Sequence, residues 1–82
     1  MPITVFDITG IPAHRRERIE SAVVAGGKNA PGSHEAFIAA DQFRGGVKVL
    51  ITGPQGLERT VMFSMDEDPV VIAERVLETL ED

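Results

Sequence analysis

The side chains that could act as nucleophiles or general bases are few, and none stands in a recognised catalytic pattern. The chain has 82 residues and no cysteine, and its histidines and serines are His14, His34, Ser21, Ser33 and Ser64. No serine lies in a Gly-x-Ser-x-Gly turn, which exposes the nucleophile of many hydrolases. His34 and Asp41 could bind a metal ion weakly, but two ligands without a defined spacing do not specify a metal site. We therefore predict no catalytic residue, no cofactor, no metal and no enzymatic activity.

The carboxylates are densest at Asp66, Glu67 and Asp68, directly before Pro69 and a segment with helical periodicity. Carboxylates are favourable at the positive end of a helix dipole, and proline suits the first helical turn. We interpret the three acids as the start of a helix and not as acid–base groups.

Basic residues gather at the start of another predicted helix, in the run His14-Arg15-Arg16-Glu17-Arg18. Helix N-termini attract anions, and arginine can bind phosphate through two parallel hydrogen bonds. A second interpretation is a solvated face that Glu17 and Glu20 partly neutralise. The sequence predicts, as an alternative function, nucleic-acid or anion binding by a set of cationic residues. These are Arg15, Arg16, Arg18, Lys28 and Arg44.

The net charge of −5 is distributed unevenly along the chain. Residues 1–63 carry seven Lys or Arg and six Asp or Glu, whereas residues 64–82 carry one Arg and seven acids. An acidic C-terminal element repels phosphate backbones over a Debye length, about 8 Å at physiological salt. The chain also has no Trp or Tyr and four Phe, so it offers few rings on which bases could stack. These features disfavour nucleic acid as the main partner.

Hydrophobic periodicity and turn residues predict two helices and at least three strands. Residues 2–8 are rich in β-branched and aromatic types, which indicates a strand. A helix is expected from about residue 12 to residue 25, ending at Gly26-Gly27. Strands at 47–52 and 57–65 flank a turn at 53–56 and form a hairpin. A last helix begins near Pro69.

The two helices each have one apolar face. In the first helix this face consists of Ile19, Ala22, Val23 and Gly26. In the last helix it consists of Ile72, Ala73, Val76, Leu77 and Leu80. Residues 34–43 fit either a helix, with Ser33 as N-cap, or a strand that pairs with the next one. We favour the strand because the segment is short and lacks a 3.6-residue period.

These elements predict one domain over residues 1–82 with an α+β fold in the order β-α-β-β-β-α. The simplest arrangement is a two-layer sandwich, with a mainly antiparallel sheet and both helices on one face. No apolar run reaches the roughly 18 residues that span a bilayer. Residues 1–4 lack the basic segment of a signal peptide, and the absence of cysteine fits a reducing compartment. We expect a cytoplasmic protein that is complete as given.

The order helix–strand–strand–strand–helix over residues 12–81 is similar to that of the double-stranded RNA-binding domain. In that family the last helix begins with a lysine-rich segment, where this chain has Asp66-Glu67-Asp68-Pro69. The strand at residues 2–8 has no counterpart in the family. The resemblance therefore implies only an order of elements, and we transfer neither function nor site residues from it.

The second face of the predicted sheet is left open, and apolar side chains are expected on it. Leu50 and Met62 point outward if their neighbours in the strands point into the core. The first strand adds either Thr4, Phe6 and Ile8 or Ile3, Val5 and Asp7. An apolar patch ringed by polar groups often marks a partner surface, although single exposed apolar residues are normal.

Leu50, Met62 and Phe6 are the predicted interface residues. Chains of this size often gain stability by oligomerising. We therefore expect a small binding module that serves protein–protein interaction or homodimerisation through the open sheet face.

Overall fold

The computed structural model describes residues 3–30, 32–41 and 45–81. The elements are β1 (Ile3–Thr9), α1 (Ala13–Gly26), β2 (His34–Asp41), β3 (Gly46–Thr52), a short 3-10 turn (Pro54–Gly56), β4 (Glu58–Ser64) and α2 (Pro69–Glu81). The predicted α+β class and element order are confirmed, and residues 34–41 form the favoured strand. Residues 42 and 43 of that segment lie outside the described residues. Neither described helix has the length and apolar character needed to cross a membrane.

The four strands form one mixed sheet in the order β1-β2-β3-β4. β1 and β2 run parallel, whereas β3 is antiparallel to both β2 and β4. The parallel pair arises because α1 connects the two strands and returns the chain to the end at which β1 began. The sheet is therefore mainly antiparallel, with β1 and β4 as its edges.

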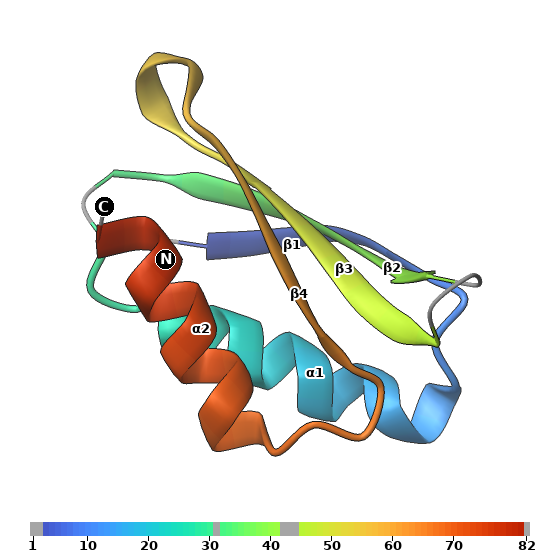
Figure 1. Ribbon diagram of the computed structural model, residues 1–82. Helices are drawn as coiled ribbons and strands as arrows, with labels where there is room; N and C mark the ends of the chain where they lie inside the picture. The colour runs from blue at the N-terminus through green and yellow to red at the C-terminus, as the bar shows by residue number, and fades with distance from the viewer. Residues whose placement is uncertain (1–2, 31, 42–44, 82) are drawn as a thin grey trace.

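Both helices lie on the same side of the sheet (Figure 1). They pack against each other, and α1 also contacts β1 while α2 contacts β4. Side chains alternate along β3 accordingly, because Val47 and Val49 are buried whereas Lys48 between them is exposed. The prediction for Leu77 is wrong, because its side chain is 39% exposed, and Ala73 and Leu80 are only partly buried. The other residues of the predicted apolar faces are buried. These are Ile19, Ala22, Val23, Gly26, Ile72 and Val76.

Gly26, in the last turn of α1, lies directly against α2. A Cβ at this position would lie 2.5 Å from the carbonyl oxygen of Ala73 and 2.7 Å from the Cβ of Val76. Only a glycine hydrogen fits into this contact, so the two helix backbones can approach closely. The helix thus includes Gly26 and ends one residue later than expected, with Gly27 as its C-cap.

Asp68 caps the start of α2. Its Oδ1 accepts a hydrogen bond from the N–H of Val70 at 2.8 Å, and its carbonyl oxygen accepts one from the N–H of Ile72 at 3.1 Å. These bonds satisfy donors that the first helical turn would otherwise leave unpaired. The interpretation of Asp68 as a helix-starting residue is therefore confirmed.

The pairing of β1 with β2 jumps from Val5 to Asp7, so Phe6 has no partner residue in β2. Such a bulge moves the residues that follow it to the opposite face of the sheet. Thr4 and Phe6 are exposed before the jump, and Asp7 is exposed after it, while Ile8 packs against the core. Neither outward set expected from strict alternation is therefore correct, because the exposed residues combine parts of both.

Candidate functional site

The open face of the sheet carries four rows of side chains that run across the strands, and the row at one end consists of Asp41, Gly46 and Ser64. The acidic row consists of Glu35, Thr52 and Glu58. The aromatic row consists of Asp7, Phe37, Leu50 and Thr60, joined by Phe6, which stacks on Phe37. The lysine row consists of Ala39, Lys48 and Met62. Neighbouring rows are two residues apart along each strand, which corresponds to about 6.8 Å.

Two phenylalanine rings dominate the aromatic row. The ring centroids of Phe6 and Phe37 lie 6.0 Å apart with 22° between the ring planes. Phe6 is 60% exposed and Phe37 is 38% exposed, so both rings are available to a partner. The bulge at Phe6 contributes to this arrangement, because it frees that residue from the regular alternation of β1.

The predicted interface residues lie on one continuous surface. Leu50 is directly opposite Phe37 in the strand pairing, and Met62 follows on the neighbouring strand in the lysine row. Met62 is 40% exposed, and Leu50 is partly buried. With the phenylalanine pair, these side chains form an apolar patch on the open face. Threonine and charged side chains surround it.

Phe37 is the member of the patch that sequence reasoning missed. Its segment fitted a strand or a helix, so no direction could be assigned to its side chains. The signal that identifies it is the alternation His34, Ala36, Ile38, which are all buried, with Phe37 between them on the opposite face.

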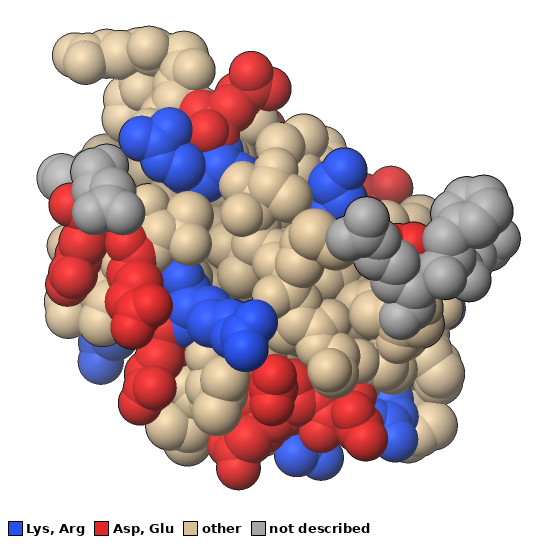
Figure 2. All heavy atoms as spheres, viewed as in Figure 1, with Lys and Arg blue, Asp and Glu red and all other residues tan. Residues whose placement is uncertain are grey.

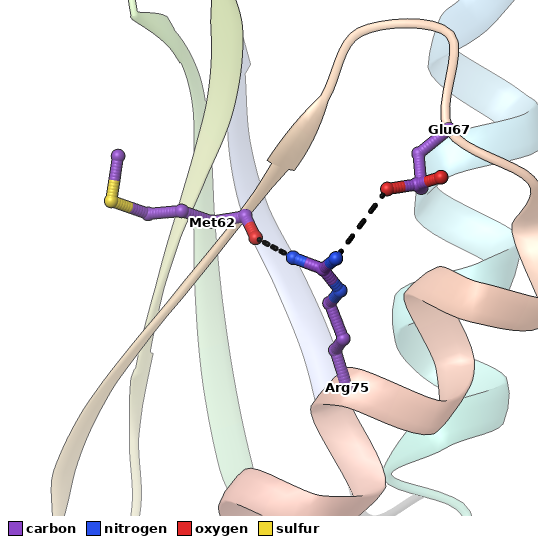
Figure 3. A network of polar contacts seen from close by, with 3 residues as sticks. All are labelled: Met62, Glu67 and Arg75. Carbon is purple, nitrogen blue, oxygen red and sulfur yellow. Dashed lines mark hydrogen bonds and ion pairs between the residues drawn. The ribbon is translucent and has the colours of Figure 1, made fainter.

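Both edge strands of the sheet, β1 and β4, have features that hinder the addition of a further strand. On β4, the Nη1 of Arg75 donates a hydrogen bond to the carbonyl oxygen of Met62 at 3.0 Å (Figure 3). The Nη2 of the same arginine lies 3.7 Å from Oε1 of Glu67. On β1, the bulge at Phe6 interrupts the pattern of backbone groups that another strand would need. Charged side chains and bulges at sheet edges oppose strand-to-strand association.

Of the five predicted cationic residues, three lie together near the start of α1: Arg15, Arg16 and Arg18. The Nη1 of Arg15 donates to the carbonyl oxygen of Met65 at 3.1 Å, and the Nε of Arg16 donates to that of Ile11 at 2.9 Å. Both arginines therefore support the fold locally. Arg18 is exposed and makes no hydrogen bond or ion pair with a described residue.

The two remaining cationic candidates do not join this group. Lys28 follows the C-terminal end of α1, about 20 Å along the helix from Arg15 at 1.5 Å per residue. Arg44 lies outside the described residues. On the face that Figure 2 shows, acidic side chains gather over α2 and the segment before it. The cations thus do not form one continuous basic surface over the described part of the chain.

His34 is the one buried polar side chain among the described residues. Its Nδ1 is buried without a hydrogen-bond partner in the described part of the chain. A Cβ at Gly53 would lie 2.6 Å from the His34 ring, so this turn packs directly on the histidine.

The described residues do not bring together a metal-binding group. No three of their His, Asp or Glu side chains lie close enough to hold a metal ion. A groove of about 470 Å³ between β1 and α1 is lined by residues that include Thr4, Glu20 and Ser21. No histidine lines this groove. The apolar patch on the open face is therefore the best-defined candidate site.

No protein-family model matches the chain, and no match is found among curated proteins or among solved structures. The function is therefore inferred from the geometry and chemistry of the chain itself.

Proposed function

We propose that this protein is a protein-interaction module and that its binding surface is the open face of the sheet. The observation that carries this proposal is the stacked pair of Phe6 and Phe37 beside Leu50 and Met62. Contiguous exposed apolar surface costs free energy in water, at about 25 cal/mol per Å². Covering it with a partner releases that cost, which is why such patches mark interaction sites.

The two edge strands hinder strand addition, and this supports a partner that packs on the open face instead. An added strand on β4 would have to compete with the hydrogen bond from Arg75 to Met62. An added strand on β1 would meet the bulge at Phe6. A partner on the open face encounters neither obstacle, and it covers the apolar side chains as well.

A protein partner fits the charges of this face better than nucleic acid does. Exposed rings can stack on bases, but Glu35 and Glu58 lie in the row next to the rings, and Lys48 is the only cation in the four rows. These carboxylates would repel phosphates within a Debye length, about 8 Å at physiological salt. The proposal assigns the protein no catalytic activity. It also places the protein in the cytoplasm. Disulfides rarely form there, and a chain without cysteine does not need them.

The test compares the wild type with Leu50→Glu/Met62→Glu by sedimentation velocity, from low micromolar to millimolar concentration. The control is Val70→Glu/Leu77→Glu, which adds the same charge at two exposed apolar residues of α2. We expect the wild type and the control to exceed the monomer mass of 8.9 kDa as the concentration rises. The face variant should remain monomeric with an unchanged circular dichroism spectrum.

If the wild type stays monomeric, the same three proteins serve as baits in affinity capture. If a protein is retained by the wild type and the control but not by the face variant, the open face binds a partner other than a second copy. The proposed interaction function is then supported. Equal retention by all three baits overturns the proposal.

A further inference from the structure

We propose that the partner on the open face is a second copy of this chain, packed face to face about a two-fold axis that runs across the strands along the aromatic row. This inference rests on the proposed function of the open face, and it adds the identity and the orientation of the partner. The charges of the acidic, aromatic and lysine rows carry it.

A two-fold axis along the aromatic row reverses the strand direction and keeps each strand opposite itself. The aromatic row of one copy then meets the aromatic row of the other, so Phe37 and Leu50 pack against their own equivalents. The acidic row of each copy meets the lysine row of the other. Such a self-complementary arrangement is the usual form of a homodimer interface.

In this orientation Lys48 lies opposite Thr52 of the second copy, because both residues belong to β3 and are equally distant from the axis. Thr52 is flanked on the neighbouring strands by Glu35 and Glu58. The two carboxylates thus lie about 4.8 Å to either side of the residue that faces Lys48. The two-fold axis forms this cluster of one cation between two anions twice.

The other simple orientation brings like charges together. A two-fold axis parallel to the strands places each row opposite the same row of the second copy. Lys48 then lies close to its own equivalent, and Glu35 lies close to its own equivalent. Like charges facing each other in a sheet are destabilising. The axis across the strands brings one such pair together, Asp7 and its own equivalent at the β1 edge, against two clusters of opposite charge. The charge pattern therefore favours the axis across the strands.

The size of the face predicts the strength of the dimer. Four strands spaced about 4.8 Å apart, each of seven or eight residues at about 3.3 Å, cover a face of roughly 19 Å by 23 Å. Its flat area, roughly 440 Å², is below the ~800 Å² that each partner buries in a typical stable complex. We therefore expect a reversible dimer with a dissociation constant in the micromolar range.

The test is a charge swap, measured by sedimentation equilibrium of the purified full chain. Lys48→Glu places three acids together at each cluster, and we expect it to weaken dimerisation by about tenfold or more. The triple variant Lys48→Glu/Glu35→Lys/Glu58→Lys restores opposite charges, so its dissociation constant should return toward the wild-type value. Lys28→Glu and Glu74→Lys/Glu78→Lys make the same charge changes at exposed residues outside the sheet and should leave the constant unchanged.

The outcomes separate this inference from the proposed function. A triple variant that dimerises no better than Lys48→Glu overturns the orientation. An equal loss with Lys28→Glu also overturns it, because the effect would then come from net charge alone. In both cases the Leu50→Glu/Met62→Glu variant still tests whether the open face is the binding surface, independently of the orientation. A wild type that is monomeric at every concentration overturns the second copy as the partner, and affinity capture then tests the proposed function independently.

Discussion

The ring of Phe6 in β1 stacks on the ring of Phe37 in β2, with 6.0 Å between the ring centroids. Both rings are exposed, whereas the residues on either side of Phe37 in β2, Ala36 and Ile38, are buried in the core. Aromatic pairs contribute about 0.5–1.5 kcal/mol beyond their buried area, so each ring holds the other in place. A patch that is ordered before binding loses less side-chain entropy when a partner arrives. The pair thus gives the open face a fixed apolar centre.

Phe6→Ala is expected to weaken self-association by about tenfold, because an aromatic anchor in an interface often contributes more than 1 kcal/mol. The matched control is Val70→Ala, which shortens an apolar side chain on α2 that is 64% exposed. Sedimentation velocity of both variants measures the effect. A loss of association with Val70→Ala that equals the loss with Phe6→Ala would place the interface on the helices.

Arg75→Ala is expected to lower the free energy of unfolding by up to about 1 kcal/mol, because it removes the hydrogen bond to Met62 and a half-exposed ion pair. It also removes a charge from the β4 edge, so we expect more light scattering at high concentration. Denaturant unfolding and static light scattering measure the two effects.

The control for this prediction is Glu67→Gln, which removes the ion pair and retains the hydrogen bond to Met62. We expect it to change the unfolding free energy and the scattering little. If Glu67→Gln has the same effect as Arg75→Ala, the ion pair and not the hydrogen bond protects this edge.

Gly26→Ala tests the close contact between the helices. Alanine favours the helix by about 0.5–1 kcal/mol over glycine. Its Cβ would lie 2.5 Å from the carbonyl oxygen of Ala73, and overpacking of this kind costs about 1–3 kcal/mol. We expect the overpacking to outweigh the gain in helix propensity, so that Gly26→Ala lowers the free energy of unfolding by about 1–2 kcal/mol.

Ser21→Ala, at an exposed position of the same helix, is the control for Gly26→Ala and should raise stability by a few tenths of a kcal/mol. Thermal and denaturant unfolding of both variants measure these changes. A Gly26→Ala variant that is more stable than the wild type would contradict the packing of α1 against α2.

Arg15→Ala and Arg18→Ala separate support of the fold from a free cationic surface. Arg15 donates to the carbonyl oxygen of Met65, a link between α1 and the segment after β4, so its loss should cost about 1 kcal/mol. Arg18 makes no such bond with a described residue, and its substitution should leave the unfolding free energy within about 0.5 kcal/mol of the wild type. Equal stability of the two variants in urea would show that the Arg15 bond contributes nothing.

Much of the fold could be predicted because its signals are local. The spacing of Ile19, Val23, Ile72 and Val76 identified both buried helix faces, and Asp68 before Pro69 marked the start of α2. The hairpin of β3 and β4 followed from alternation on either side of a turn rich in Gly and Pro. Each of these patterns depends on residues a few positions apart, where steric and capping preferences act directly.

The centre of the candidate site could be predicted only in part, because it depends on contacts between distant segments. Leu50, Met62 and Phe6 were identified from alternation alone, but the direction of Ile8 was not, since a bulge has no dependable local signal. Phe37 was missed because its short segment fitted two secondary structures. The hydrogen bond from Arg75 to Met62 joins residues 13 positions apart in different elements, so no spacing rule predicts it.

The most direct test of a face-to-face pair across the aromatic row is crosslinking from a single cysteine with a short bis-maleimide, since the chain has no cysteine of its own. In the proposed dimer Thr60 faces its own equivalent across sheets about 10 Å apart. Two copies of Thr52 are displaced by a further ~14 Å along the strands. We predict efficient crosslinking of Thr60→Cys under native conditions and little of Thr52→Cys. Equal crosslinking of the two variants, or none above the level in denaturant, would contradict the account.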